Sequence, residues 1–297
     1  MNNISRRRFT KTLAVATAGA SLPLRLGWAQ KAASSLIGGV QLGVQSYSFR
    51  DRNFDQAIEA IVEVGINSCE LWSGHLEPRG LDPTKLRQWR LETPLSYFEE
   101  SGQKLRHAGI QLNAYNYSFR RDMTDPEIER GFQMAKALGT MVITASSNPS
   151  MAKRVDGYAQ KYKMRVGMHN HAQGGKADEY DGPKDFAAAM AGASPYICIN
   201  LDIGHFVAAG FDPVEFIEQH HARIVTLHIK DRKKGLGISS PTLKFGTGDT
   251  PIPQVLQLLK KKQYKIPANI EHEIDGQPAV EGVKESLEYC KKALAQG

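Results

Sequence analysis

The feature that most constrains the fold is a regular alternation of short apolar strands and amphipathic helices that begins at Val40. Eight strand candidates lie between Val40 and Glu273, and each is followed by a helical segment. This alternation predicts a parallel sheet, because two parallel strands need a long connection, which a helix usually provides. Eight such units in a domain of about 250 residues are typical of a closed (β/α)8 barrel.

An open, doubly wound α/β sheet is the alternative architecture for the same alternation. A nucleotide-binding sheet of that kind carries a G-x-G-x-x-G motif after its first strand. No such motif follows the first strand candidate, 40–49. We therefore predict an α/β fold with a single (β/α)8 TIM barrel over 40–297.

Composition supports a domain with a large core and argues against a nucleic-acid partner. The chain of 297 residues is 41% hydrophobic, which suits one large α/β domain. Its formal charge of +7 depends mostly on residues 1–29, which hold five basic residues and no acidic one, so the remainder carries only +2. A charge this small gives no electrostatic footprint for DNA or RNA.

The three cysteines, Cys69, Cys198 and Cys290, do not form a C-x-x-C motif. Cys69 and Cys198 lie within strand candidates, where we expect buried thiols that pack as small apolar side chains. The sequence leaves one disulfide open.

The first 29 residues have the features of an export signal. Residues 5–11, S-R-R-R-F-T-K, resemble the twin-arginine motif S-R-R-x-F-x-K at every fixed position, and a mildly apolar run follows over 13–26. Gly27 and Ala29 supply the small residues that a signal peptidase requires. We expect a twin-arginine signal peptide over 1–29, a polar linker over 30–39 and a periplasmic protein exported in its folded state. The apolar run is too short and too weakly apolar for a stable membrane span.

Metal-competent side chains occur where the strand candidates end. The strand 197–202 places Ile197, Ile199 and Leu201 on one face, so Asp202 falls on the other face at its C-terminal end. In a barrel, the C-terminal strand ends supply the active residues. The other side chains at or just past such ends are Glu70, Trp72, His75, His169, His171, His205, His228, Lys230, Glu271 and Glu273.

A lone buried histidine is most often a core residue with its hydrogen bonds satisfied. If these residues were only structural, four independent strand ends would each have to carry a metal-competent side chain by coincidence. The convergence of two or three carboxylates with several imidazoles therefore predicts a metal site. Three other histidines, His107, His220 and His221, lie near helix C-termini, where the helix dipole favours a cationic ring. His272 has the opposite parity from its two glutamate neighbours, and we expect it to face the helices.

Five short motifs resemble the xylose isomerase-like barrel superfamily, which contains sugar isomerases, ketose 3-epimerases and inosose dehydratases. They are L-D-I-G-H at 201–205, A-G-F-D-P at 209–213, H-I-K-D at 228–231, G-T-G-D at 246–249 and I-E-H-E at 270–273. The resemblance extends over most of the chain from Val40 and is strongest from Met164 onward. Together the motifs are specific for the superfamily but not for a substrate.

The resemblance implies one divalent metal ion held by side chains from four strands. In the epimerase branch these are Glu, Asp, His and Glu. Asp202, His228 and Glu271 correspond to the last three of these ligands. His169, with His171 as an alternative, stands at the position of the first ligand, where the epimerases have glutamate. Imidazole is a good ligand for Mn, Fe, Co or Zn. The replaced glutamate is one of two carboxylates that move a proton across the sugar, so its loss argues against simple two-carboxylate epimerisation.

The resemblance also implies chemistry that begins with a carbonyl next to a carbon that bears a hydrogen. Removal of that proton gives an enediolate, which a metal bound to the carbonyl and a neighbouring hydroxyl stabilises. Glu271 is the expected base if it contacts metal and substrate together, and His169 or His171 could act from the opposite face.

The remaining strand-end residues are expected to hold the sugar. Lys230 and His205 are placed to polarise or hydrogen-bond sugar oxygens. Alternatively, Lys230 is buried and only forms an ion pair with Glu273 or Asp202, without a role in sugar binding. The expected substrate-binding residues are Glu70, Trp72, His75 and Glu273.

Three functions follow from this chemistry and stay open at this point. The first is a metal-dependent isomerase or epimerase that acts on an unphosphorylated keto-sugar. The second is a 3-keto-glycoside lyase, which uses the same ligands but expels the aglycone from the enediolate by β-elimination. The third is a non-catalytic sugar-binding protein. A small-molecule sugar or glycoside is the expected partner, and the sequence leaves an oligomer open.

Overall fold

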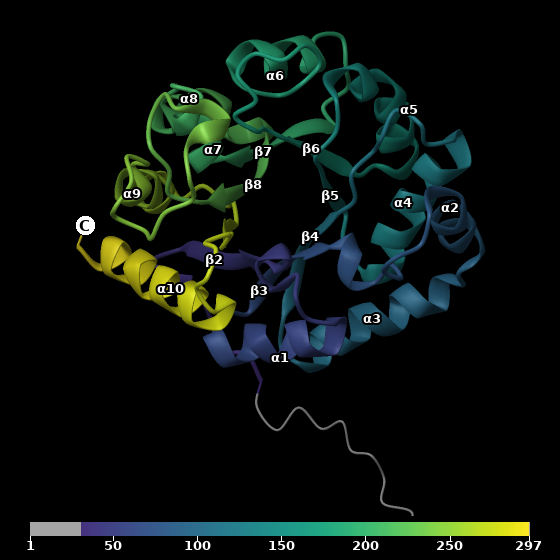
Figure 1. Ribbon diagram of the computed structural model, residues 1–297, viewed down its shortest axis with the longest axis horizontal. Helices are drawn as coiled ribbons and strands as arrows, with labels where there is room; N and C mark the ends of the chain where they lie inside the picture. Colours follow the sequence, from purple (N-terminus) through teal and green to yellow (C-terminus); the bar gives the residue numbers. More distant parts are fainter. Residues whose placement is uncertain (1–30, 297) are drawn as a thin grey trace, which may run out of the picture.

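The computed structural model describes residues 31–296 as one closed parallel barrel, so the predicted (β/α)8 fold is confirmed. Eight strands pair in sequence order, the last pairs with the first, and the helices form a ring around them (Figure 1). The barrel strands are β2 (Val40–Gln45), β3 (Ser68–Trp72), β4 (Gln111–Asn116), β5 (Val142–Ala145), β6 (Arg165–His169), β7 (Ile197–Asp202), β8 (Ile224–Ile229) and β9 (Ala268–Ile270). The helices are α1 (Phe54–Val64), α2 (Pro83–Glu92), α3 (Leu95–His107), α4 (Asp125–Leu138), α5 (Ala152–Tyr162), α6 (Pro183–Met190), α7 (Ile203–Ala208), α8 (Pro213–His220), α9 (Ile252–Lys262) and α10 (Ala279–Ala295).

The start of the described chain contains a strand that the sequence did not predict. Within the expected linker, 30–39, β1 (Leu36–Ile37) pairs antiparallel with the beginning of β2. Gly38 and Gly39 make the turn between the two strands with φ of 57° and 84°, a left-handed conformation that glycine adopts without a steric penalty. The predicted signal peptide, 1–29, lies outside the described residues.

The first helix illustrates how local sequence positions the outer ring. The Asn53 side chain accepts a hydrogen bond from Gln56 N, and the Gln56 side chain accepts one from Asn53 N, which is a capping box. The helix ends at Gly65, whose φ of 84° makes a left-handed C-cap. Between these signals Ile58 and Ile61 are buried in the core.

Across residues 31–296, no helix is both long and apolar enough to cross a membrane.

Several strands end earlier than the sequence pattern predicted, and this affects how the site is held. Ser46–Phe49 forms a 3-10 turn after β2 instead of extending the strand. Since β6 ends at His169 and β9 ends at Ile270, the residues His171, Glu271 and Glu273 lie in the segments that follow the strands. The polar cluster is therefore built on strand ends and on the first residues of the loops.

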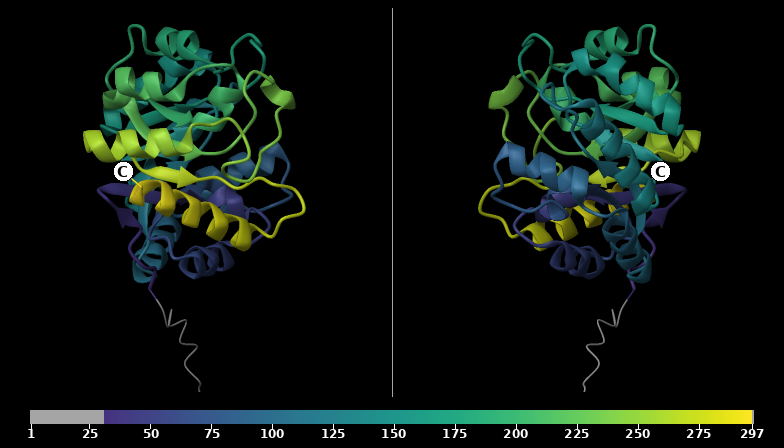
Figure 2. Two further views of the ribbon diagram at one scale, coloured as in Figure 1. Left: turned by 90° about the vertical axis from the view of Figure 1, so that its left-hand side faces the viewer. Right: turned by 90° about the vertical axis from the view of Figure 1, so that its right-hand side faces the viewer.

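The register of the strands brings polar residues to one end of the barrel. His169 lies opposite Asn200 of β7, and Asp202 lies opposite His228 of β8. Long loops project from the same end, at which the strands finish (Figure 2). This end of the barrel therefore holds both the polar side chains and the loops that surround them.

Candidate metal centre and active site

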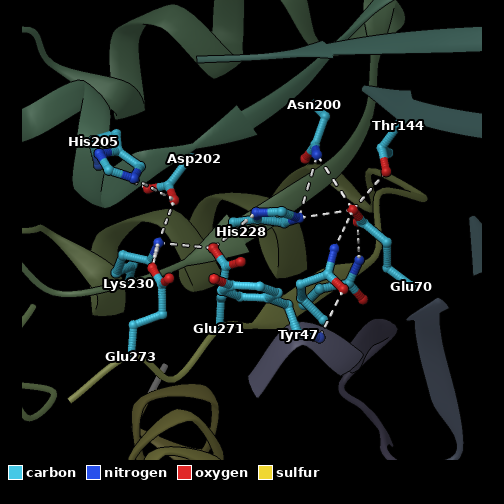
Figure 3. A network of polar contacts seen from close by, with 12 residues as sticks. Tyr47, Glu70, Thr144, Asn200, Asp202, His205, His228, Lys230, Glu271 and Glu273 are labelled. Carbon is cyan, nitrogen blue, oxygen red and sulfur yellow. Dashed lines mark hydrogen bonds and ion pairs between the residues drawn. The ribbon is translucent and has the colours of Figure 1, made fainter. Parts of the chain in front are cut away.

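A buried carboxylate, Glu70 on β3, lies at the base of the site and is held by side chains of the barrel interior. Its Oε1 accepts hydrogen bonds from Gln45 Nε2 at 2.7 Å and from Thr144 Oγ1 at 2.6 Å. Its Oε2 accepts one from Asn269 Nδ2 at 3.0 Å. His228 Nε2 lies 3.0 Å from the same Oε1 (Figure 3). A substrate-binding role does not fit a carboxylate that is 0% exposed, and Glu70 is instead placed to orient His228.

The imidazole of His228, on β8, lies between two carboxylates. Its Nε2 faces Glu70, and its Nδ1 lies 3.1 Å from Oε2 of Glu271. Burial alone would lower the pKa of His228, but the two carboxylates outweigh burial and raise that pKa well above its usual value. A metal ion at Nδ1 would take the place of this positive charge. Glu70 would then keep the proton on Nε2, as carboxylates behind metal-bound histidines do.

Lys230 fills the space between three carboxylates (Figure 3). Its Nζ lies 2.6 Å from Glu273 Oε2 and 2.8 Å from Glu271 Oε2. The same nitrogen lies 3.2 Å from Asp202 Oδ2. Burial alone would lower the pKa of Lys230, but the three carboxylates outweigh it and raise the pKa. Burial would likewise raise the pKa of Glu271, but the neighbouring cations lower it well below its usual value. Lys230 pairs with both Glu273 and Asp202, the two carboxylates that the alternative to a sugar-binding role named, and its ammonium marks a cation position.

Asp202 is positioned by the backbone at the junction of β7 and α7. Its Oδ1 caps α7 by accepting a hydrogen bond from His205 N at 2.7 Å. The buried side chain of Asn170 accepts a hydrogen bond from Asp202 N at 2.9 Å and donates one to Asp202 O at 3.1 Å. Because the cap occupies Oδ1, the second oxygen, Oδ2, is the one that faces Lys230.

Three imidazoles, from His169, His171 and His205, lie beside the carboxylates. The ring centroids of His169 and His171 are 4.7 Å apart, and those of His171 and His205 are 5.3 Å apart. Burial is the main cause that lowers the pKa of each ring, which favours the neutral form of all three. Arg232 donates a hydrogen bond to Nδ1 of His205. In the neutral ring this contact leaves the proton on Nε2, which lies 3.8 Å from Asp202 Oδ2.

The side chains present fit a divalent cation. Two groups have ligand atoms that all lie within 4.8 Å of one another, and these groups are His169, Asp202 and His205, and Asp202, His228 and Glu271. Within the described residues, the buried atoms His169 Nδ1, Asp202 Oδ2 and His228 Nδ1 lack an aligned hydrogen-bond partner, which is rare for buried polar atoms. Imidazole and carboxylate ligands suit Zn, Fe, Co or Mn. All four predicted ligands are members of these two groups.

Trp72 is the last residue of β3 and His75 follows in the next turn, with ring centroids 5.4 Å apart. The Nε2 of His75 is 2.9 Å from the carbonyl oxygen of Ser46, which holds the loop to the end of β2. Trp72 packs edge-on against Tyr47 at 5.0 Å and lines a cavity of about 290 Å³. Their role in substrate binding stays a prediction.

Three polar residues that hold the predicted ones were not identified from the sequence, namely Asn170, Asn200 and Arg232. Asn200 lies on the same strand face as the ligands, and its Nδ2 is 3.2 Å from His228 Nε2. Arg232 continues the period-two pattern past Lys230, so parity could have identified both residues. Asn170 has the opposite parity from its histidine neighbours, and no sequence signal identifies it.

The positions expected for residues outside the site are confirmed, whereas the cationic ring expected at His220 is not, because burial lowers the pKa of that ring. The ring of His272 packs against Gly282 of α10, on the outer side of the barrel. His107 and His220 are the last residues of α3 and α8. The three cysteines are buried free thiols, so the structure contains no disulfide among the residues it describes.

Fold and site together define a barrel protein with a metal-competent centre at the C-terminal ends of its strands. The family model described as xylose isomerase-like TIM barrel matches residues 58–293, and the chain belongs to this family. Family members and structural neighbours are mostly carbohydrate-processing enzymes.

Individual relatives are more distant. The chain is 27% identical over 195 residues to 3-oxo-isoapionate decarboxylase from Pectobacterium atrosepticum, a match that covers 60% of this chain and 69% of that protein. The solved structure of an IolI protein with a bound zinc atom is 15% identical, with a TM-score of 0.65, and the match covers 86% of this chain and 99% of that one. A D-tagatose 3-epimerase-like protein is 17% identical with a TM-score of 0.63, over 86% of this chain and 99% of that one. At these identities the two structural matches show the shared fold.

Proposed function

We propose that this protein is a divalent-metal-dependent enzyme that forms the enediolate of an unphosphorylated keto-sugar, as sugar isomerases and epimerases do. The observation that carries the proposal is the convergence of Asp202, His228 and Glu271 on one buried cation position, which the ammonium of Lys230 already reaches. The family and the epimerase-like structural neighbour support a sugar as the substrate.

Asp202, His228 and Glu271 would hold the metal, with His169 as the fourth ligand. When bound, a divalent metal supplies a Lewis acid for the carbonyl and the neighbouring hydroxyl of the sugar. Glu70 holds Nε2 of His228, and the α7 cap holds Oδ1 of Asp202. His228 and Asp202 therefore each have one atom left to face the cation, which pre-organises this part of the site.

The chain offers proton-accepting groups on two sides of the sugar. Glu271 follows β9, and His171 follows β6, so β7 and β8 lie between them. The lowered pKa of His171 leaves its ring neutral and able to accept a proton. Lys230 can donate hydrogen bonds to the oxygen on which negative charge develops, a form of stabilisation that is strong in a buried site.

One observation favours a second function, that of a 3-keto-glycoside lyase. His169, which takes the place of a glutamate of the epimerases, is 5% exposed, and burial lowers its pKa. In this second function His169 would act as the base instead of as the fourth ligand: its neutral imidazole takes the proton from C2, the electron pair forms the enediolate, and the C1–O bond then breaks to release the aglycone. The leaving oxygen takes its proton from Lys230 or from water. The relative named as a decarboxylase of 3-oxo-isoapionate also acts on an oxo compound.

We further propose that the protein is exported. Residues 5–11 match the twin-arginine pattern, and Ala29 ends a predicted signal peptide. Export in the folded state would allow a metal to be loaded before transport. It would also restrict the substrates to unphosphorylated sugars or glycosides of the periplasm.

Product analysis separates the two proposed reactions. The protein without residues 1–29, loaded with Mn²⁺ or treated with chelator, is mixed with a plain ketose and, separately, with 4-nitrophenyl 3-keto-glucoside. A new sugar from the ketose supports isomerisation or epimerisation, and metal-dependent release of nitrophenol supports the lyase. Glu271→Gln should abolish either activity. If metal-loaded protein transforms neither compound, the proposed chemistry is wrong and sugar binding without catalysis becomes the better account.

A further inference from the structure

A cavity of about 290 Å³ lies at the ends of β3 and β4, between α2 and the loop that follows β4. Trp72 and Asn116, the last residues of the two strands, both line it. They lie opposite one another in the strand register, and both have the inward parity of Glu70. The cavity therefore reaches the mouth of the barrel.

The cavity wall is connected to the candidate metal centre by side-chain contacts. Asn116 Nδ2 donates a hydrogen bond to Thr144 Oγ1 at 3.1 Å. Thr144 Oγ1 in turn donates one to Glu70 Oε1 at 2.6 Å, and this oxygen faces His228 (Figure 3). The cavity and the centre thus belong to one continuous polar site.

The position of the cavity in the barrel suits the far end of a substrate. In the closed strand order, β3 and β4 lie across the barrel from β7 and β8, which carry Asp202 and His228 (Figure 1). A substrate with one ring at the cation position can therefore place a second ring in the cavity. Small-molecule sites have volumes of about 300–1,000 Å³, so a cavity at the lower end of this range suits a single ring.

The indole of Trp72 forms an ordered apolar wall. Tyr47 packs edge-on against it at 5.0 Å and His75 at 5.4 Å. A Cβ on Gly74 would lie 2.2 Å from Cζ2 of Trp72, so the indole keeps this position only because residue 74 is glycine. Since the indole is held on these sides but is only half-buried, it offers apolar surface to a ligand.

The charges of the lining balance, which narrows the chemistry of the ligand. Arg90 Nε lies 2.8 Å from Glu77 Oε1, and Arg87 Nε lies 2.6 Å from Glu127 Oε2. The other two charged residues of the lining are Arg120 and Asp122. Three positive and three negative charges disfavour a phosphate, a carboxylate or an ammonium group, whereas their polar atoms can bond the hydroxyl groups of a neutral ligand.

We propose that this cavity is a second subsite of the active site and binds a neutral glycosyl ring that is joined to the reacting keto-sugar. Trp72 packs on the apolar face of this ring, and Asn116 bonds its hydroxyl groups. The substrate is then a keto-disaccharide or a similar glycoside rather than a free monosaccharide. This substrate class rests on the proposed function, which places the reacting ring at the cation position.

An NMR titration of the protein with methyl β-cellobioside, a neutral disaccharide that has no ketone and cannot react, tests the subsite. The indole N–H signal of Trp72 and the side-chain amide signals of Asn116 should shift and saturate. The indole signal of Trp89 should stay in place, because that ring packs on Phe98 and does not line the cavity. Methyl β-D-glucopyranoside should bind more weakly, since it fills one subsite only.

Two variants alter the indole wall in different ways. Trp72→Leu should weaken binding of the disaccharide about threefold to tenfold, the effect of one lost aromatic contact. Gly74→Ala should also weaken it, because the added methyl group displaces the indole. Tyr264→Leu and Gly157→Ala are the matched controls, since the Tyr264 ring stacks on His221 away from the cavity and the added atom at Gly157 meets nothing within 4 Å.

Three results would overturn the proposal: no shift at Trp72, equal affinity for the monosaccharide and the disaccharide, or unchanged affinity in both cavity variants. Failure of the proposed reaction gives a different result. In that case metal-loaded protein leaves a ketose and a 3-keto-glucoside unchanged, while methyl β-cellobioside still shifts the Trp72 signal.

Discussion

His228 Nε2 lies 3.0 Å from Glu70 Oε1, and this contact places a fully buried carboxylate directly behind the most central histidine of the site. The same ring presents Nδ1 to Glu271 at 3.1 Å. The orientation of His228 is thus determined from one side, and its second nitrogen is left for the proposed metal. Much of the account follows from this arrangement.

Replacement of Glu70 by glutamine should reduce metal affinity about 10- to 100-fold, the usual cost of losing the carboxylate behind a metal-bound histidine. Calorimetric titration with Zn²⁺ or Mn²⁺ measures the effect. Glu127→Gln is the matched control for metal binding, because Glu127 is similarly buried at 2% exposure but pairs with Arg87 and belongs to neither group of candidate ligands. Equal affinities in the two variants would rule out the positioning role of Glu70.

The ammonium of Lys230 pairs with the carboxylates that would bind the metal and therefore competes with it. Lys230→Met removes this buried cation and should strengthen metal binding on the order of tenfold. Catalytic turnover should nevertheless fall, because the variant lacks the donor to the developing oxyanion. Lys233→Met is the control, since Lys233 pairs with Asp249 at the surface. Weaker metal binding in the Lys230 variant, measured by the same titration, would contradict the assignment of a shared cation position.

The contact between His272 and Gly282 predicts a stability difference between two helical glycines. Gly282→Ala should destabilise the fold by about 1–3 kcal/mol, because the added methyl group would overlap the His272 ring. Gly157→Ala in α5, where the added atom meets nothing within 4 Å, should stabilise by about 0.5–1 kcal/mol through helix propensity. Urea denaturation of both variants provides the comparison, and a neutral Gly282→Ala would show that the ring does not lie against α10.

The proposed export route predicts that replacement of both Arg6 and Arg7 by lysine keeps the protein in the cytoplasm as a longer precursor. Arg8→Lys, at the variable position of the motif, should leave export unchanged. Cell fractionation followed by mass determination of the mature N-terminus distinguishes these outcomes. A periplasmic double-lysine variant would argue against a twin-arginine signal.

The part of the site that could be predicted from the sequence depends on strand parity. Asp202, His228 and Lys230 follow a strict period-two pattern, and parallel strands in a barrel all finish at the same end. Parity also holds for Glu271 and Glu273, although the strand ends before them, since both side chains contact Lys230.

The partners of each polar side chain could not be predicted in the same way. Glu70 receives donors from Gln45, Thr144 and Asn269, which are between 25 and 199 residues away along the chain. No local pattern encodes such contacts, because they depend on how the strands tilt and pack around the barrel axis. This is why Glu70 was assigned to the substrate from the sequence, whereas the structure places it against Nε2 of His228.

The measurement that tests the central claim most directly is solvent exchange at the carbon next to a ketone. The protein without residues 1–29 is incubated in D₂O with a 3-keto-glucoside or a ketose, with and without Mn²⁺, and the sugar is followed by proton NMR. The account predicts loss of the signal of the proton next to the ketone, or expulsion of the aglycone, only in the metal-loaded sample and not in Asp202→Asn. Metal-loaded protein that leaves this proton untouched in both compounds would contradict enediolate chemistry at this site.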